Sequence, residues 1–283
     1  MFDEAMVDFD EALRLNPRDS YALRGRGNCR FGRGEYDEAI IDYSRAVRLD
    51  RRDKYAYCMR GECWARQGDL DEAIADYDRA LRIDPDDVLS HLHRGDAWRE
   101  KRDYAKAIVD FDAALRLDPD NAWALANRGR CWSRQGDFPK ALADLDRAIQ
   151  LDPTDPDAFF QRGHIRAAQG EFAQAVADLD AVLQLDPHDA MAYNAKAWLL
   201  ATCPDAKFRD GKQAIELAKK ALQLADEPEV LDTLAAAYAE VGDFERAIEY
   251  QTQLLEAADL GDLQSEPRRA RLKLYQQKQP YRQ

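Results

Sequence analysis

Apolar and small residues recur along this chain at intervals of three and four positions, in segments that short polar turns separate. Ala107, Phe111 and Ala114, for example, fall on one side of a helix that the pattern places at about 104–117. A similarly patterned segment at about 89–101 precedes it. The pattern therefore predicts a pair of amphipathic helices joined by a short turn.

The predicted helix pair repeats along the chain every 34 residues. Each first helix carries a glycine at this interval, and each second helix an alanine: Gly27, Gly61, Gly95, Gly129 and Gly163, then Ala39, Ala73, Ala107, Ala141 and Ala175. These small side chains let the two helices of a unit approach closely. A fixed period indicates a stack of one supersecondary unit, in which each unit contacts only its neighbours. Such a stack presents a long surface and no natural pocket for chemistry, so binding is the first functional hypothesis.

The ends of the predicted helices carry residues that start and stop helices. A short polar side chain ahead of each first helix can accept the free N–H groups of the first turn. These residues are Asp19, Asp53, Asp87, Asn121, Asp155 and Asp189. Glycine ends the first helix, as at Gly68, and Arg102 replaces it in one unit. Asp69 with Glu72 is typical of a capping box, and a proline such as Pro85 stops the second helix.

The repeating unit resembles a tetratricopeptide repeat. The resemblance rests on the 34-residue period and on the segments Gly-Asp-Leu-Asp-Glu-Ala at 68–73 and Ala-Leu-Arg-Ile-Asp-Pro at 80–85. It implies an all-α fold, a right-handed superhelical solenoid of tandem helix-turn-helix repeats. It also implies that the first helices line a concave groove and that a peptide or a partner protein binds there.

We expect a single solenoid over 1–283, with one helix before Ser20, two in each of seven units and a terminal capping helix. Residues 1–19 match only the second helix of a unit, so we expect a half repeat there, because the chain is a fragment or an upstream domain has been removed. Regular repeats are expected at 20–53, 54–87, 88–121, 122–155 and 156–189. The remaining segments are a repeat at 190–227 with an insertion at about 203–211, a last repeat at 228–258, and a capping helix and tail at 259–283, with the helix at about 267–277.

The C-terminal part, about the last 85 residues, resembles the closing module of certain bacterial tetratricopeptide proteins. The resemblance rests on Ala-Trp-Leu-Leu-Ala-Thr-Cys-Pro-Asp at 197–205, Arg-Asp-Gly at 209–211 and Pro-Tyr-Arg at 280–282. Such proteins often carry their repeats behind another domain, such as a kinase or a protease. A second function is therefore open: a C-terminal regulatory or self-association module of a larger protein whose catalytic domain lies upstream.

The charge of the chain limits the kinds of molecule that we expect it to bind. Asp and Glu number 54 against 41 Lys and Arg, and the formal net charge is −13. An acidic chain repels nucleic-acid backbones and membrane head groups, so we expect neither as a partner. No apolar run is long enough to span a membrane and no signal peptide is visible, which favours a cytoplasmic protein.

Few residues offer catalytic or metal-binding chemistry. The five cysteines lack metal-ligand spacing, and Cys29, Cys63 and Cys131 occupy equivalent positions, so we expect reduced core residues. His91 and His93 are two apart and point in different directions on a helix. No phosphate-binding glycine loop, nucleophile elbow or dinucleotide fingerprint occurs. We therefore expect no enzyme, no cofactor and no metal.

Two sets of charged residues each have two interpretations. Arginines at 26, 60, 94, 128 and 162 repeat together with aspartates at 42, 76, 110, 144 and 178, either as a cationic ladder for a partner or as structural pairs between packed helices. Because the two series always occur together, we favour the structural pairs. The second set is the basic tail, Arg268, Arg269, Arg271 and Lys273. It forms an arm that binds nucleic acid or a membrane surface, or it forms the solvated side of a capping helix. The acidity of the chain favours the cap.

The candidate groove residues vary between repeats and, by the geometry of the family, lie on the first helices. They are Tyr21, Arg24, Asn28, Tyr55, Met59, Glu62, Leu89, His93, Asp96, Trp123, Asn127, Arg130, Arg134, Phe160, His164 and Trp198. Aromatic, Arg and Asn side chains are suited to anchoring a peptide. A merely solvated face is the alternative.

Within this set, Arg24 and Asn28 share one helical face and resemble half of the carboxylate clamp of some family members. Met59 stands where that clamp needs a second asparagine, so chaperone binding is not predicted. Asn127 and the arginines at 130 and 134 form a second cluster that could hold a carboxylate or phosphate.

The sequence thus predicts a non-catalytic protein–protein interaction scaffold with a partner of unknown identity. The N-terminal half repeat could also self-associate, because Phe2 and Phe9 would lack a packing helix there.

Overall fold

The described part of the chain, residues 2–225, 227–257 and 262–283 of a computed structural model, is helical and contains no strand. It forms 16 α-helices and one short 3₁₀ helix, as the period of the sequence predicts. The helices are α1 Phe2–Leu15, α2 Ser20–Gly32, α3 Tyr36–Leu49, α4 Lys54–Gln67, α5 Leu70–Ile83, α6 Val88–Glu100, α7 Tyr104–Leu117, α8 Ala122–Arg134, α9 Phe138–Leu151, α10 Pro156–Ala168, α11 Phe172–Leu185, α12 Ala190–Thr202, η1 Ala206–Phe208, α13 Gly211–Leu224, α14 Glu229–Glu240, α15 Phe244–Ala257 and α16 Asp262–Gln276.

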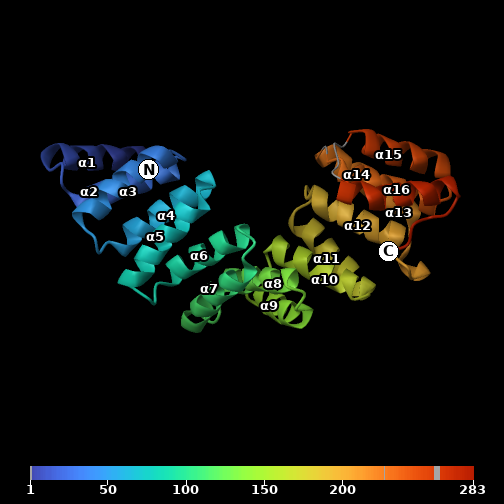
Figure 1. The fold of residues 1–283 in the computed structure, drawn as a ribbon, viewed down its shortest axis with the longest axis horizontal. Helices are drawn as coiled ribbons and strands as arrows, with labels where there is room; N and C mark the ends of the chain where they lie inside the picture. Colours follow the sequence, from blue (N-terminus) through green and yellow to red (C-terminus); the bar gives the residue numbers. More distant parts are fainter. Residues whose placement is uncertain (1, 226, 258–261) are drawn as a thin grey trace. The chain divides into compact units, whose positions relative to one another are not determined.

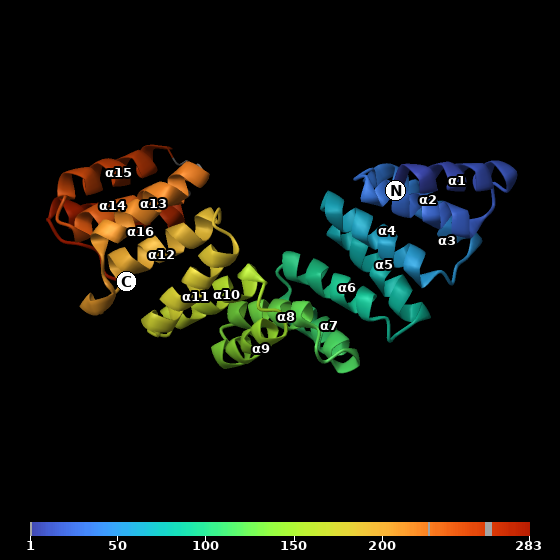
Figure 2. The same cartoon turned by 180° about the vertical axis from the view of Figure 1, so that it is seen from behind.

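The helices form two compact units, residues 1–151 and 152–283. In unit 1, helix α1 precedes the hairpins α2/α3, α4/α5, α6/α7 and α8/α9, and each hairpin lies beside the next (Figure 1). Unit 2 holds the hairpins α10/α11, α12/α13 and α14/α15, with α16 packed on α15 (Figure 2). Within a unit, successive first helices also contact one another, as α4 contacts α6 and α12 contacts α14. The first helices of each unit therefore share a surface, which we call its A face.

Most of the predicted helix caps are present. The side chains of all six predicted N-cap residues accept a backbone N–H of the following turn, as Asp19 does from Ala22. Gly68 has a φ of 87° and Arg102 a φ of 61°, so the arginine adopts the left-handed backbone that glycine takes in other units. The predicted capping box at Asp69 is wrong, because its side chain makes no capping hydrogen bond.

The repeating glycines bring the two helices of a hairpin into direct contact. A β-carbon on Gly95 would lie 2.9 Å from Cε1 of Phe111, and one on Gly61 would lie 2.7 Å from Cε1 of Tyr77. Both rings are fully buried. The aromatic side chain of the second helix therefore occupies the space that any larger residue on the first helix would need.

The C-terminal end of unit 2 departs from the repeat. The insertion forms η1, and α13 begins at Gly211. Helix α16 begins at Asp262, before the predicted start, so that Pro267 lies inside it. Its Tyr275 is fully buried and joins the core that α12 to α15 form, which is the packing expected of a cap. The expected repeat end at 258 and the break near Gly261 lie outside the described residues.

The contact between Gly95 and Phe111 yields a stability prediction. We expect Gly95→Leu to lower the free energy of unfolding by about 1–3 kcal/mol, because the added side chain must displace a buried ring. Urea denaturation followed by circular dichroism measures the change. Glu100→Leu, at the exposed end of the same helix, is the control. Equal stability of the two variants would contradict this account of helix packing.

Candidate functional site

The repeated arginines are paired within the protein rather than offered to a partner. Arg128 donates from Nε and Nη2 to both carboxylate oxygens of Asp144, at 2.8 and 2.7 Å. Its Nη1 donates to Asp112 of the preceding hairpin at 2.6 Å. The same two-bond contact joins Arg26 to Asp42, Arg60 to Asp76, Arg94 to Asp110 and Arg162 to Asp178. The structural interpretation of this ladder is confirmed.

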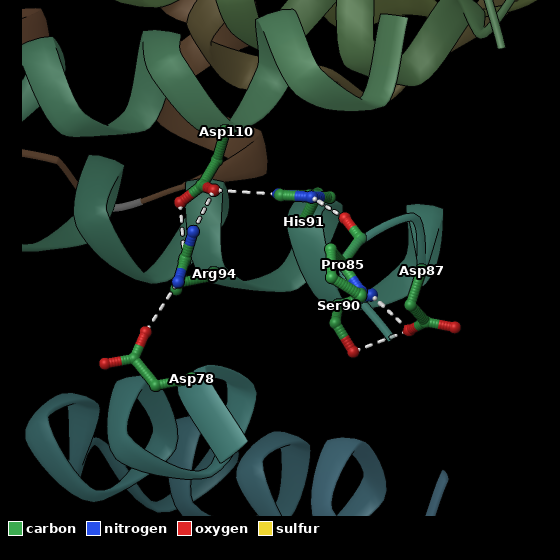
Figure 3. Close-up of polar contacts among 7 residues, drawn as sticks. All are labelled: Asp78, Pro85, Asp87, Ser90, His91, Arg94 and Asp110. Atoms are coloured by element: carbon green, nitrogen blue, oxygen red, sulfur yellow. Dashed lines mark hydrogen bonds and ion pairs between the residues drawn. The ribbon is translucent and has the colours of Figure 1, made fainter. Parts of the chain in front are cut away.

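A histidine extends the ladder in the third full hairpin of unit 1. Figure 3 shows Arg94 between Asp78 and Asp110, and His91 between Asp110 and the carbonyl of Pro85. His91 Nδ1 lies 3.0 Å from Asp110 Oδ1, and Nε2 lies 2.9 Å from the carbonyl oxygen of Pro85. The carboxylate of Asp110 raises the pKa of His91 against the opposing effect of burial, because both ring nitrogens face acceptors.

The A face of unit 1 has a pocket at its N-terminal end. Tyr21, Arg24, Asn28 and Tyr55, four of the predicted groove residues, line it together with Phe9, and its volume is about 650 Å³. Arg24 lies 5.1 Å from the ring centroid of Tyr21 and 5.5 Å from that of Tyr55. These cation–π contacts hold the guanidinium at the mouth of an aromatic pocket.

Arg24 and Asn28, the predicted half of a carboxylate clamp, already make hydrogen bonds within the protein. Arg24 Nη1 donates to Asp53 Oδ2 at 2.9 Å, and Asn28 Oδ1 accepts from the hydroxyl of Tyr43 at 2.7 Å. These bonds use one guanidinium nitrogen of Arg24 and the amide oxygen of Asn28, and they leave N–H donors on both side chains.

In the middle of unit 1, predicted groove residues pair with one another. Glu62 accepts from Arg66 at 2.8 Å and from the hydroxyl of Tyr77 at 3.2 Å, and it lies 3.1 Å from His93 Nδ1. Burial alone would raise the pKa of Glu62, but the bonds and charges of His93 and Arg66 outweigh it and lower that pKa to about 2. This part of the A face is a polar network around the buried Glu62 carboxylate, with the Arg66 side chain exposed at its edge.

Two of the three other predicted residues in this region also have internal contacts. Met59 packs against the core of the first hairpins, and Asp96 accepts from Arg99 at 2.8 Å. Leu89 is partly exposed at the start of α6. The central A face therefore offers less free polar surface than the sequence suggests.

Helix α8 carries free groups. Trp123 is 45 % exposed, and the side chains of Arg130 and Arg134 make no hydrogen bond or ion pair among the described residues. Asn127 differs from them: it is buried, and its Nδ2 donates to the carbonyl of Trp123 at 2.9 Å. The predicted polar cluster thus reduces to two arginines, and the exposed Trp123 of the same helix packs edge to face on Phe111 with ring centroids 5.9 Å apart.

The A face of unit 2 has a pocket of about 500 Å³, which we call the unit-2 pocket. Its walls include the predicted residues Phe160, His164 and Trp198. The Phe160 and His164 rings meet edge to face with centroids 4.6 Å apart. Trp198 Nε1 donates to Gln283 Oε1 at 3.1 Å. Helix α10, helix α12 and the end of the chain therefore meet at this pocket.

The unit-2 pocket also contains residues that the sequence reasoning missed. They are Met191, Asn194, Glu227, Glu229, Asp232, Arg268 and Arg271. Asn194 stands 34 residues after Phe160, so the period could have identified it. The two arginines come from α16, which is outside the repeat, and no spacing in the sequence connects them to this pocket.

Two of the four predicted basic residues of α16, Arg268 and Arg271, turn inward to Asp232, whereas Arg269 and Lys273 are exposed. Arg271 donates to both oxygens of Asp232, at 2.9 and 2.5 Å, and lies 5.5 Å from the ring centroid of Trp198 and 5.3 Å from that of Tyr281. Arg268 lies 3.9 Å from Asp232 and is 11 % exposed. These contacts agree with a capping role for α16.

The remaining chemistry is limited. All five cysteines are free and buried, and burial raises the pKa of Cys58 and of Cys63 to about 12, so both thiols stay protonated. No group of three or more His, Cys, Asp or Glu side chains in the described ranges could hold a metal ion. No described helix is both long and apolar enough to cross a membrane.

Family models described as tetratricopeptide repeat match most of the chain. They cover residues 2–54, 55–87, 97–159, 128–199 and 228–259. The chain belongs to the tetratricopeptide repeat family. No curated protein matches this tetratricopeptide chain.

Solved structures with a similar fold include other tetratricopeptide proteins. YrrB, described as a TPR protein with an unusual peptide-binding site, is 23 % identical over 66 % of this chain and 97 % of its own, with a TM-score of 0.56. Pseudomonas aeruginosa pilF is 23 % identical over 78 % of this chain and 99 % of its own, with a TM-score of 0.65. A chain of the APC/C hetero-tetramer Cut9–Hcn1 is 18 % identical over 83 % of this chain and 46 % of its own, with a TM-score of 0.70. At sequence identities this low, the similarity to these structures shows only that the fold is shared.

The paired arginines and aspartates predict that removing one arginine destabilises the folded protein. We expect Arg128→Met to lower the free energy of unfolding by about 2–3 kcal/mol, because it leaves the carboxylate of Asp144 buried without a counter-charge. The control is Arg147→Met, whose exposed pair with Asp120 should contribute less than about 1 kcal/mol. Urea denaturation measures both variants, and equal losses would show that the ladder is not structural.

The environment of His91 predicts a pH dependence. Because its pKa in the folded protein is raised above the ordinary 6.5, its stabilising contribution is complete below that value and is lost as the pH rises through the folded-state pKa. The difference in melting temperature between the wild type and His91→Phe should therefore be largest below pH 6.5 and should shrink as the pH rises above it. Thermal melts at several pH values test this, and a constant difference would contradict it.

Proposed function

We propose that this tetratricopeptide protein is a non-catalytic scaffold that binds a peptide or a partner protein along its A faces. The proposal rests on where the two pockets of about 650 and 500 Å³ lie, which is on the A faces of unit 1 and unit 2. Both are lined mainly by first-helix side chains, and both fall in the range of about 300–1,000 Å³ that is common for ligand sites.

The distribution of free and occupied side chains supports the same surface. The arginines of the ladder are used for stacking the hairpins, whereas Arg130 and Arg134 have no partner in the described chain. Exposed Trp123 and Tyr21 stand on the same class of helix, and aromatic and arginine side chains are the common anchors of protein interfaces. The tetratricopeptide fold itself suggests a protein–protein interaction scaffold.

The charge of the chain supports a protein rather than a nucleic-acid partner. The net charge of −13 makes the approach of a phosphate backbone to the chain unfavourable. A peptide contact over an A face requires only local complementarity, which Arg130, Arg134 and the aromatic pockets supply.

The proposal predicts that bound peptides depend on the A faces. A random peptide library displayed on phage is selected against the full chain, and the affinity of the selected peptides is measured by fluorescence anisotropy. For each peptide, we expect at least one variant among Tyr21→Ala, Arg130→Ala/Arg134→Ala and Phe160→Ala to weaken binding by about tenfold or more, as loss of an interface anchor does.

The control for this selection is Ile41→Ala/Val109→Ala, which removes two exposed apolar side chains of second helices; Val109 also lines a third pocket, of about 380 Å³, between α6 and α7. This variant should bind the selected peptides as the wild type does. Selected peptides that depend on Ile41 and Val109 but not on the A faces would overturn the proposal. Failure to select any peptide that binds the folded chain would also overturn it.

A further inference from the structure

The accessible walls of the unit-2 pocket are mainly apolar. Phe160, Met191 and Trp198 line it, and Met191 is 57 % exposed. The small residues Gly163 and Ala167 line it as well. Such walls favour an aromatic or large aliphatic side chain, whose transfer from water to an apolar site is favourable.

The accessible charge at this pocket is acidic. Glu229 is 58 % exposed at its side chain, and its Oε1 lies 3.5 Å from Arg268 Nη2. The side chain of Glu227 makes no hydrogen bond or ion pair with the described residues. The arginines of the pocket are less accessible: Arg271 is paired to Asp232 through two bonds, and Arg268 is 11 % exposed, although its buried Nη1 has no hydrogen-bond partner among the described residues. A ligand at the mouth of the pocket therefore meets two carboxylates.

The C-terminal tail shows how a chain segment lies against this part of unit 2. Tyr281 lies with its ring centroid 5.9 Å from that of Trp198, and Arg282 Nη2 lies 2.5 Å from Glu240 Oε2. The backbone N–H of Gln283 donates to the carbonyl of Thr202 at 3.0 Å. An aromatic residue followed by an arginine thus already docks next to the pocket, with its cation on a glutamate and its backbone on α12.

We propose that the unit-2 pocket binds an extended peptide segment in which an aromatic or large aliphatic residue stands next to a lysine or arginine. The apolar side chain lies against Phe160, Met191 and Trp198, and the cation lies between the carboxylates of Glu227 and Glu229. This inference rests on the proposed scaffold function and assigns the chemistry of one of its partners.

Three labelled, terminally blocked hexapeptides test the inference with the full chain: Ser-Gly-Phe-Lys-Ser-Gly, the same peptide with Glu in place of Lys, and the same peptide with Ala in place of Phe. Fluorescence anisotropy measures their affinities at low and at physiological salt. The Phe-Lys peptide should bind about tenfold more tightly than either of the others, and salt should weaken it.

Variants locate the binding. Glu227→Gln/Glu229→Gln should weaken the Phe-Lys peptide by about tenfold, and Met191→Lys should do the same by repulsion at the pocket edge. The matched control is Glu216→Gln/Glu245→Gln, which removes two exposed carboxylates of α13 and α15. It should bind as the wild type does, and circular dichroism melts confirm that each variant is folded.

The outcomes separate this inference from the proposed function. Preference for the Phe-Glu peptide, lost on Phe160→Ala, would overturn the assigned charge, would point to Arg268 as the determinant, and would leave the scaffold intact. Absence of binding by every hexapeptide, or equal binding by the Glu227/Glu229 variant, would overturn the inference. The phage selection reports on the scaffold independently of either result.

Discussion

A buried aspartate in each second helix is the constraint on which the repeats of this protein depend. Asp42, Asp76 and Asp110 are almost fully buried, and a carboxylate in that position is stable only with a counter-charge. The arginine of the first helix provides it and reaches the preceding hairpin with its remaining nitrogen, as Arg94 reaches Asp78. One side chain therefore closes a hairpin and also stacks it on its neighbour.

The residues that hold the repeats together, which we call the frame, differ from the residues of the candidate site. A residue that repeats every 34 positions is engaged by its own repeat, as Gly95 is by Phe111 and Arg128 by Asp144. Positions that vary between repeats are free of this constraint, and the pockets of about 650 and 500 Å³ are lined mainly by such positions on first helices. The acidic character of the chain follows partly from the frame, while the A faces carry local exceptions such as Arg130 and Arg134.

The end of unit 2 is different because it is not periodic. Helix α16 places Arg271 on Asp232 and Tyr275 in the core, and the tail then crosses to Trp198 and Thr202. The cap thus closes the apolar end of the stack and at the same time supplies one wall of the unit-2 pocket. Stability and the shape of the candidate site are coupled at this end of the protein.

The sequence alone determined the helical hairpins and their frame, because helix amphipathicity, capping and a 34-residue period are local properties. It also predicted the paired arginine and aspartate series. Only the tertiary structure decided which groove candidates are free. Glu62 and His93 face each other across neighbouring helices, and Asn127 turns to the backbone of its own helix. The wall that Arg268 and Arg271 form depends on contacts across 39 residues, which no local pattern encodes.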